Sequence, residues 1–246
     1  MTGEVCGRVG GAAPDKRGRA MHRPSVPKDL DHPERLWARA ATLAVVAAGV
    51  DDGDEYSWSR HGLRCENDGG SYWWRLQLFE GGRALLCGQD SDGSYTHDGG
   101  RQIDFLAGGP EWLPWERLRQ DAEGNLFGFV YWWQDGAWAR APYPAKMPDD
   151  GLAMAMNWAA PGEAAIDKLV EDLVARTETE VDPGAAVRAF LAAAAARTVG
   201  PADLAALLGA VCDEDAWYDV RPDAALAFAV RLGLTAGDRG GMPVAS

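Results

Sequence analysis

Apolar residues recur at three- and four-residue spacing in the segment that begins at Pro33. The recurring positions are Leu36, Trp37, Ala40, Leu43, Ala44 and Ala47. This spacing gathers apolar side chains into one stripe along a helix, and Asp31 is available to cap the first turn. The pattern therefore predicts a helix that begins near Pro33 and ends near Gly49.

Residues 55 to 145 favour β-strands, because runs rich in aromatic and aliphatic residues are separated there by turn residues. YWWRLQLF (72–79), EGG and RALLCGQ (83–89) predict two strands joined by a glycine turn. LFGFVYWW (126–133) and AWARAPY (137–143) flank Asp135-Gly136, a pair that tolerates the positive φ angles of a tight hairpin turn. Residues 110 to 119 predict a turn that leads into a short helix, with Pro114 in its first turn.

The chain after Pro148 is typical of helices. Four alanine-rich segments follow, each with a proline near its start: Pro161, Pro183, Pro201 and Pro222. Proline is tolerated at the first helical position, so we expect four short helices packed as antiparallel neighbours. The apolar positions expected to face inward are Ile166, Leu169, Leu173, Phe190, Leu204, Leu207, Leu208, Leu226 and Val230.

Together these elements predict an α+β fold with an N-terminal helix, a Trp-rich antiparallel β-sheet and a C-terminal bundle of short Ala-rich helices. We expect residues 1–30 to form a disordered basic arm, because they lack apolar periodicity. Residues 31–148 would hold the helix and the sheet, and residues 149–236 a helical bundle packed on the sheet. Residues 237–246 would form a flexible tail.

Charge and composition narrow the classes of partner and the compartment. The formal net charge is −13, and an acidic surface repels phosphates, which argues against a nucleic-acid partner. No run approaches the roughly 20 apolar residues that span a bilayer, so we expect no membrane partner and a cytoplasmic location. The four cysteines form no CxxC pair, which indicates reduced thiols.

The loop GQDSDGSYTHDGG (88–100) holds the most conspicuous polar cluster. A calcium loop needs a glycine at its sixth position and acids at its ends. With Gly93 at the sixth position the ends fall on Gly88 and Gly99, and a start at Asp90 puts Tyr95 where the glycine belongs. Both registers fail, so we expect no metal and interpret the loop as a turn, since turns collect Asp, Ser and Gly for backbone reasons.

Tryptophan is the other unusual feature. Two adjacent pairs, Trp73-Trp74 and Trp132-Trp133, fall in predicted strands. Neighbours in a strand point to opposite faces, so one member of each pair enters the core while the other faces solvent, another layer or a partner. We favour a covering layer, which the C-terminal helices could supply, over a protein-binding face and over a pocket for sugars or other small molecules.

Signatures of known catalytic sites are missing: HExxH, GxSxG and a phosphate-binding loop do not occur. The leading hypothesis is therefore an acidic intracellular protein, of the kind that includes immunity proteins, that binds a basic protein partner and has no cofactor. Its predicted binding residues are Asp90, Asp92, His97, Asp98, Trp74 and Trp132. The alternative is a hydrolase or a small-molecule or carbohydrate-binding protein whose pocket lies between sheet and helices, with His97 and the loop aspartates at its mouth.

Overall fold

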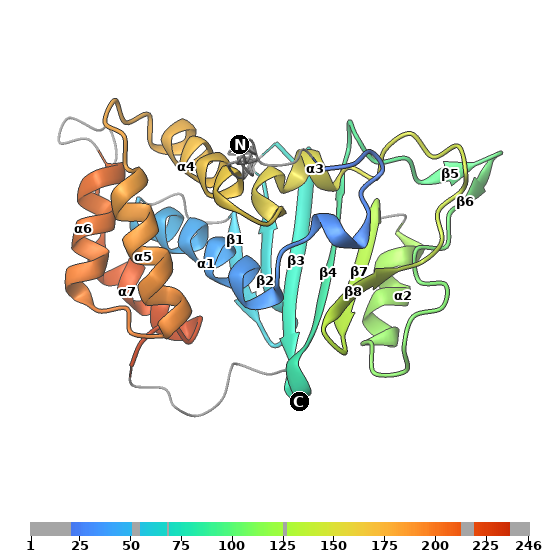
Figure 1. Cartoon of the computed structure of the whole chain (residues 1–246), viewed down its shortest axis with the longest axis horizontal. Coiled ribbons are helices and arrows are strands. Elements are labelled where there is room, and N and C mark those ends of the chain that lie inside the picture. The colour runs from blue at the N-terminus through green and yellow to red at the C-terminus, as the bar shows by residue number, and fades with distance from the viewer. Residues whose placement is uncertain (1–20, 51–54, 68, 125–126, 213–218, 237–246) are drawn as a thin grey trace, which may run out of the picture.

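The computed structural model describes residues 21–50, 55–67, 69–124, 127–212 and 219–236 (Figure 1). Its α-helices are α1 (Pro33–Gly49), α2 (Trp115–Glu123), α3 (Leu152–Ala155), α4 (Glu163–Thr177), α5 (Gly184–Ala196), α6 (Pro201–Val211) and α7 (Pro222–Arg231). Three short 3-10 helices are η1 (Pro27–Asp29), η2 (Glu80–Gly82) and η3 (Asn157–Ala159). The strands are β1 (Tyr56–Ser59), β2 (Gly62–Glu66), β3 (Tyr72–Phe79), β4 (Arg83–Asp90), β5 (His97–Asp98), β6 (Arg101–Gln102), β7 (Phe129–Gln134) and β8 (Ala137–Arg140).

The centre of the fold is a six-stranded antiparallel sheet in the order β1-β2-β3-β4-β7-β8. The β5–β6 hairpin and α2 are inserted between β4 and β7. Figure 1 shows α1 and the C-terminal helices on one side of this sheet and α2 on the other. The predicted α+β fold, with an N-terminal helix, an antiparallel sheet and C-terminal helices, is confirmed.

Both predicted hairpins form. Tyr72 of β3 pairs with Asp90 of β4, and this register runs without a break to the turn. At the second turn Asp135 and Gly136 have φ angles of 52° and 80°, the left-handed values that a two-residue hairpin turn requires. A two-residue turn depends mainly on the residues within it, so the sequence alone predicts it.

The two faces of the sheet bury separate apolar clusters, and each tryptophan pair divides between them. Trp74 is buried with α1, whereas Trp73 is buried with residues from the opposite face. Trp132 joins the cluster of Trp73, and Trp133 packs against the cluster of Trp74. Each tryptophan pair therefore packs against one layer on each face of the sheet, as we expect if a second layer covers the outward tryptophan.

The layer on the second face differs from the one that we expected. It consists of α2 and the segment 103–113, whereas the C-terminal helices pack on the α1 side (Figure 1). A buried ion pair attaches α2 to the sheet, because Arg75 Nη2 of β3 donates to Asp121 Oδ2 at 2.9 Å. Both side chains are almost fully buried, so the short helix is fixed by charge as well as by apolar contact.

The predicted helix from Pro33 to Gly49 is confirmed as α1, but Asp31 is not its cap. His32 occupies the capping position, and its ring accepts from the Glu34 backbone N–H. The Asp31 carboxylate instead accepts from Arg35 Nε at 2.6 Å and Arg39 Nη2 at 2.7 Å. The same carboxylate accepts from the His32 backbone N–H at 2.7 Å. Its strongest bonds are the charge-assisted ones to the two guanidinium groups.

The four proline-initiated helices are present as α4 to α7, and the short α3 precedes them. One inward position was wrong: Val230 is 44% exposed, while Ala225 and Ala229 of the same helix are fully buried. The helix α7 packs along α1: a Cβ on Gly49 would lie 3.4 Å from the Cβ of Ala225, and Trp37 Nε1 near the start of α1 donates to the Leu232 carbonyl. Small residues at this contact let the two backbones approach, so the larger Val230 faces away.

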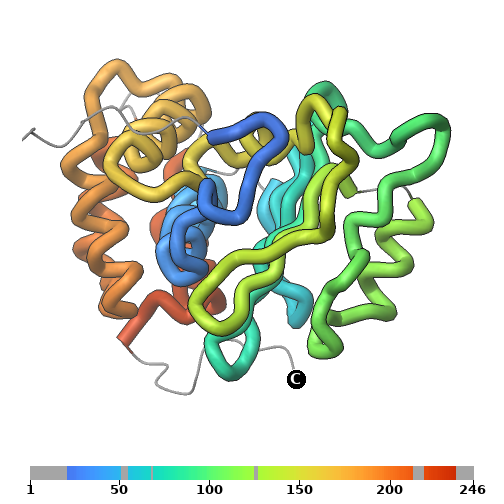
Figure 2. Tube along the Cα trace, turned by 45° about the vertical axis from the view of Figure 1, so that its right-hand side comes forward, coloured from blue at the N-terminus to red at the C-terminus, as the bar shows by residue number. Residues whose placement is uncertain are grey.

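Residues 21–30, which we expected to belong to a disordered arm, pack against the protein. Ser25 is fully buried, and its N–H and Oγ donate to Asp150 Oδ1 at 3.2 and 2.9 Å. Figure 2 shows this segment in dark blue beside β8. The rest of the predicted arm (1–20) and the predicted tail (237–246) lie outside the described residues. Within the described part, none of the helices has the length and apolar character needed to cross a membrane.

Candidate functional site

The loop 88–100 uses its first aspartate for the backbone. Asp90 is buried, and its Oδ1 accepts from the N–H groups of Asp92 at 3.0 Å and Gly93 at 2.7 Å. Asp92, His97 and Asp98 are exposed. Among the described residues, no group of three or more His, Cys, Asp or Glu side chains is arranged to hold a metal ion. The four predicted loop residues therefore do not converge on one site, and Asp90 forms the turn that its sequence context favours.

The loop also fixes the start of α3. Ser94 Oγ accepts from the Asp90 N–H at 3.0 Å and donates to the Asp150 carbonyl at 2.9 Å. On the far side of the turn, a Cβ on Gly93 would lie 2.7 Å from the sulfur of Met154 in α3. This close approach explains the glycine, and it ties the loop to α3, whose Met154 lines a pocket between the sheet and the helices.

The two predicted binding tryptophans are both buried, with 1% exposure for Trp74 and 6% for Trp132. Trp132 lies in the apolar cluster under α2, so it does not offer an exposed aromatic surface. Trp74 lies on the opposite face and forms part of a pocket wall. The structure therefore separates these two residues, which the sequence could not distinguish.

A pocket of about 860 Å³ lies between the sheet and the helices. Its apolar and aromatic lining residues are Leu43, Val50, Tyr56, Tyr72, Trp74, Met154, Ala155, Trp158 and Ala175. Its polar and charged lining residues are Glu55, Asn67, Asn157, Asp172, Arg176 and Asp219. The volume is within the range of sites for small organic ligands.

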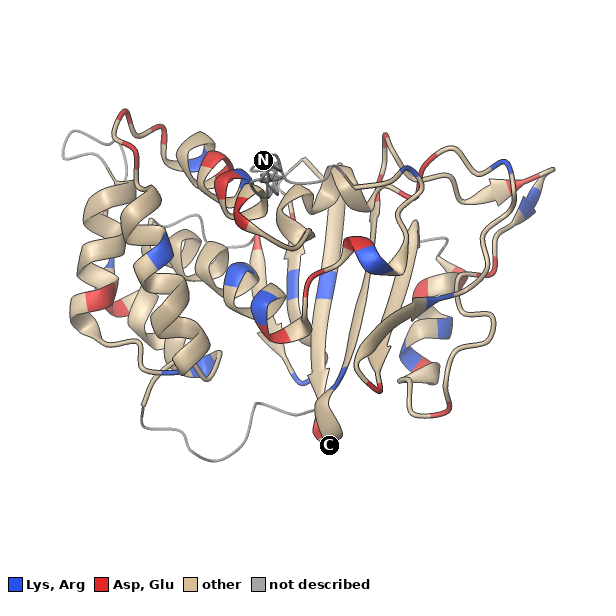
Figure 3. Ribbon diagram, viewed as in Figure 1, with Lys and Arg blue, Asp and Glu red and all other residues tan. Residues whose placement is uncertain are grey.

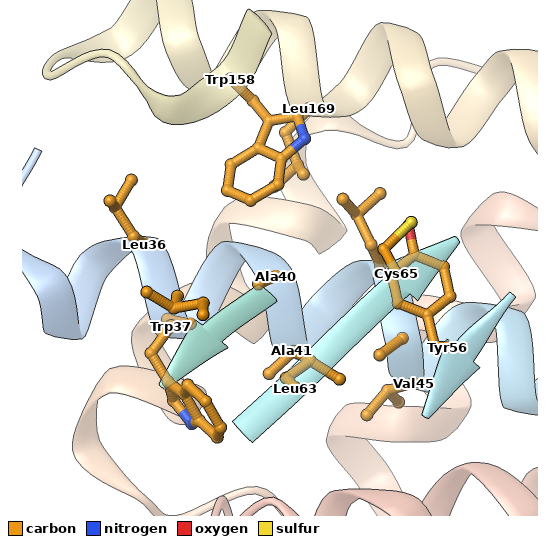
Figure 4. Close-up of a cluster of buried hydrophobic side chains, with 14 of the residues drawn as sticks. Leu36, Trp37, Ala40, Ala41, Val45, Tyr56, Leu63, Cys65, Trp158 and Leu169 are labelled. Carbon is orange, nitrogen blue, oxygen red and sulfur yellow. The ribbon is translucent and has the colours of Figure 1, made fainter. Parts of the chain in front are cut away.

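Aromatic rings form one wall of this pocket. The rings of Trp74 and Trp158 meet edge to face with centroids 5.7 Å apart, and Tyr56 contacts Trp74 in the same way at 6.0 Å. Figure 4 shows Trp158 directed from η3 towards the strands that carry Tyr56 and Cys65. Edge-to-face packing fixes the orientation of each ring, so the wall is rigid before any ligand arrives.

An ion pair between Glu55 and Arg176 of α4 lies at the same wall. The Arg176 guanidinium carbon is 5.5 Å from the centre of the Tyr56 ring. The buried Cys65 thiol donates to Glu55 Oε1 at 3.4 Å. Burial, together with the charge of Glu55, raises the pKa of Cys65 well above its usual range, so this thiol stays protonated and is no nucleophile.

Asp172 of α4 is a second acid in the pocket, four residues before Arg176. Its Oδ1 accepts from Asn157 Nδ2 at 3.3 Å. Burial raises the pKa of Asp172, and the Asn157 hydrogen bond opposes that rise. Spacing of four residues places Asp172 and Arg176 on one helical face, which is why both reach the same pocket.

The pocket wall formed by η3 is attached to α1. Arg39 of α1 donates through Nη1 to the carbonyl oxygens of Trp158 at 2.9 Å and Ala160 at 2.8 Å. The Asp31 N–H donates to the Ala159 carbonyl at 2.9 Å. Because these bonds fix the backbone on both sides of Trp158, a buried charged network sets the position of a pocket side chain.

A second buried carboxylate, Asp150, fixes α3. Besides Ser25, it accepts from the hydroxyl groups of Tyr131 and Tyr143, each at 3.1 Å, and its Oδ1 lies 3.4 Å from the Leu152 N. Burial raises the pKa of Asp150, although these donors act in the opposite direction. The side chain joins the N-terminal segment, β7 and the start of α3.

The charged side chains at the pocket are three carboxylates and one guanidinium group, those of Glu55, Asp172, Asp219 and Arg176. The lining residues of the pocket, within the described part of the chain, include no histidine, serine, cysteine or lysine. His97 and the loop aspartates do not line it either, so the alternative with those residues at its mouth does not match the geometry. Sequence reasoning missed the polar lining residues because they come from five separate segments and share no motif.

Comparison of the chain with protein-family models, with curated proteins and with solved structures gives no match. The functional argument therefore rests on the pocket itself.

Proposed function

We propose that this protein binds a small organic ligand in the pocket between β1–β3, α1, α3 and α4. The observation that carries the proposal is a cavity of about 860 Å³ that combines an aromatic wall with several polar groups. Apolar walls supply affinity and a few fixed polar groups supply orientation in sites of this kind. Trp74 thus contributes to binding as part of the pocket wall.

Binding of phenylbutanol, a neutral molecule with a ring and a short chain, tests this proposal by calorimetry. We expect a dissociation constant on the order of 0.1 to 1 mM, as its small number of heavy atoms allows. Ala175→Trp, which places a large ring at an exposed lining position of α4, should abolish the binding. The matched control is Ala189→Trp, at an exposed position of α5 that is not among the lining residues, and it should bind as the wild type does.

A different result would contradict the pocket as the binding site. If Ala175→Trp and the wild type bind phenylbutanol equally well, the ligand lies elsewhere. If the wild type binds neither phenylbutanol nor a charged molecule with the same body, the proposed function is wrong. Circular dichroism of both variants separates loss of binding from loss of folding.

A second candidate function is recognition of a basic protein partner by the loop 88–100, as expected for an immunity-type protein. The specific observation is Tyr95, which is 50% exposed between the exposed acids Asp92 and Asp98. Tyrosine is enriched at binding hot spots, and the net charge of −13 accelerates encounters with cations. The described cysteines, Cys65, Cys87 and Cys212, form no disulfide, which is consistent with action in the cytoplasm.

Pull-down from the native lysate tests this second candidate. We expect a basic protein to be captured at low salt and lost at high salt, because the Debye length shortens to about 3 Å at 1 M salt. The variant with Asp92→Asn, Tyr95→Ala and Asp98→Asn should fail to capture it at low salt as well. Capture that survives both changes would exclude the loop as the recognition surface.

A further inference from the structure

The charges around the pocket indicate which class of ligand it takes. We propose that the ligand is an organic cation, a protonated amine or quaternary ammonium group joined to an apolar body. This inference rests on the proposed ligand-binding function and adds the sign of the ligand's charge.

Acids outnumber bases among the lining residues. Glu55, Asp172 and Asp219 line the pocket with a single base, Arg176. Arg176 forms its ion pair with Glu55. Among the described residues, neither Asp172 nor Asp219 has a basic side chain within ion-pair distance. Helix α4 carries basic as well as acidic residues (Figure 3), and Lys168 and Arg176 act on Asp172 only at longer range. Three carboxylates against one guanidinium group leave the lining with an excess of negative charge.

Asp172 is better placed than Asp219. Its side chain is partly buried, and it accepts a hydrogen bond from Asn157 of the neighbouring η3. A carboxylate that has lost part of its hydration gains from a cation in contact with it. Asp219 is exposed at the margin of the pocket and adds negative potential there.

The aromatic wall favours the same kind of ligand. Tyr56, Trp74 and Trp158 are buried in this wall, whereas Tyr72 is half-buried and has the most ring surface open to a ligand. The face of such a ring attracts cations. The Arg176 guanidinium already lies 5.5 Å from the Tyr56 ring centre, so a cation is accommodated beside this wall. The carboxylates of Asp172 and Asp219 would repel an anionic ligand. The guanidinium group of Arg176, which could attract an anion, already pairs with Glu55.

Three probes with one body and different charges test the inference by calorimetry at neutral pH: phenylbutylamine, phenylbutanol and phenylbutyrate. We expect the amine to bind about tenfold more tightly than the alcohol, which corresponds to about 1.4 kcal/mol. Phenylbutyrate should bind more weakly than the alcohol. The variant Asp172→Asn should bring the affinity for the amine to within about threefold of that for the alcohol, both measured in this variant.

The matched control is Asp167→Asn, the same substitution at an exposed acid of α4 that is not among the lining residues. It should retain the preference for the amine. Equal affinities for amine and alcohol in the wild type would overturn the inference while the proposed function stands. An amine preference that survives in Asp172→Asn would also overturn the inference, and failure of all three probes to bind would overturn both the inference and the proposed function.

Discussion

Replacement of Asp150 by alanine should destabilise the protein by about 4 kcal/mol, the sum expected when several buried donors lose their acceptor. The carboxylate is fully buried and accepts from Ser25, Tyr131 and Tyr143. Alanine would leave these donors without a partner in a space too small for full solvation. Urea unfolding followed by tryptophan fluorescence gives the free energy of unfolding.

Two further variants make this measurement specific. Tyr131→Phe removes one donor and keeps the acceptor, so we expect a loss of only about 1 kcal/mol. Asp98→Ala removes an exposed aspartate of the β5–β6 hairpin and should change the free energy of unfolding by less than about 0.5 kcal/mol. If Asp150→Ala is no more destabilising than Asp98→Ala, Asp150 does not hold α3 in place.

Replacement of Arg39 by methionine should destabilise the protein by about 3 kcal/mol, because it removes one of the two guanidinium partners of the buried Asp31 and the donor to two carbonyl oxygens. Arg39 is 4% exposed and pairs with Asp31, which is 2% exposed. It also donates to the carbonyls of Trp158 and Ala160. Methionine keeps most of the length and the apolar part of the side chain. The loss of stability therefore measures the contribution of the bonds that the guanidinium group makes.

Arg35→Met is the matched control, since Arg35 pairs with the same Asp31 but has a side chain that is 64% exposed. An exposed partner contributes less than about 1 kcal/mol. Arg39→Met should in addition weaken phenylbutanol binding, because Trp158 loses the bonds that position its backbone, and Arg35→Met should not. Equal losses of stability in the two variants would show that the carbonyl bonds of Arg39 contribute nothing.

Asp150 and Arg39 explain how the pocket keeps its shape although two of its walls are very short helices. The walls formed by α3 and η3 are only four and three residues long, too short to be stable as isolated helices. Asp150 fixes the first and Arg39 fixes the second. Specific polar bonds therefore replace the helical cooperativity that these short segments lack.

The sequence by itself determined the elements whose signals are local. Three such signals are the apolar spacing in α1, the Asp135-Gly136 turn, and the prolines at the starts of α6 and α7. Each depends on residues a few positions apart, so neighbouring side chains are enough to specify the element. The same is true of the loop 88–100. Asp90 bonds to the backbone two and three residues later, as turn chemistry predicts.

Only the tertiary structure decided which faces meet and what lies between them. The sequence placed one tryptophan of each pair on each face, but the second layer proved to be α2, which Arg75 and Asp121 attach to the sheet. Trp74 and Asp172 reach one pocket from β3 and α4. The spacing of apolar residues specifies which side of a helix or strand is buried. It does not specify which other element covers that side, because this depends on contacts between residues far apart in the chain.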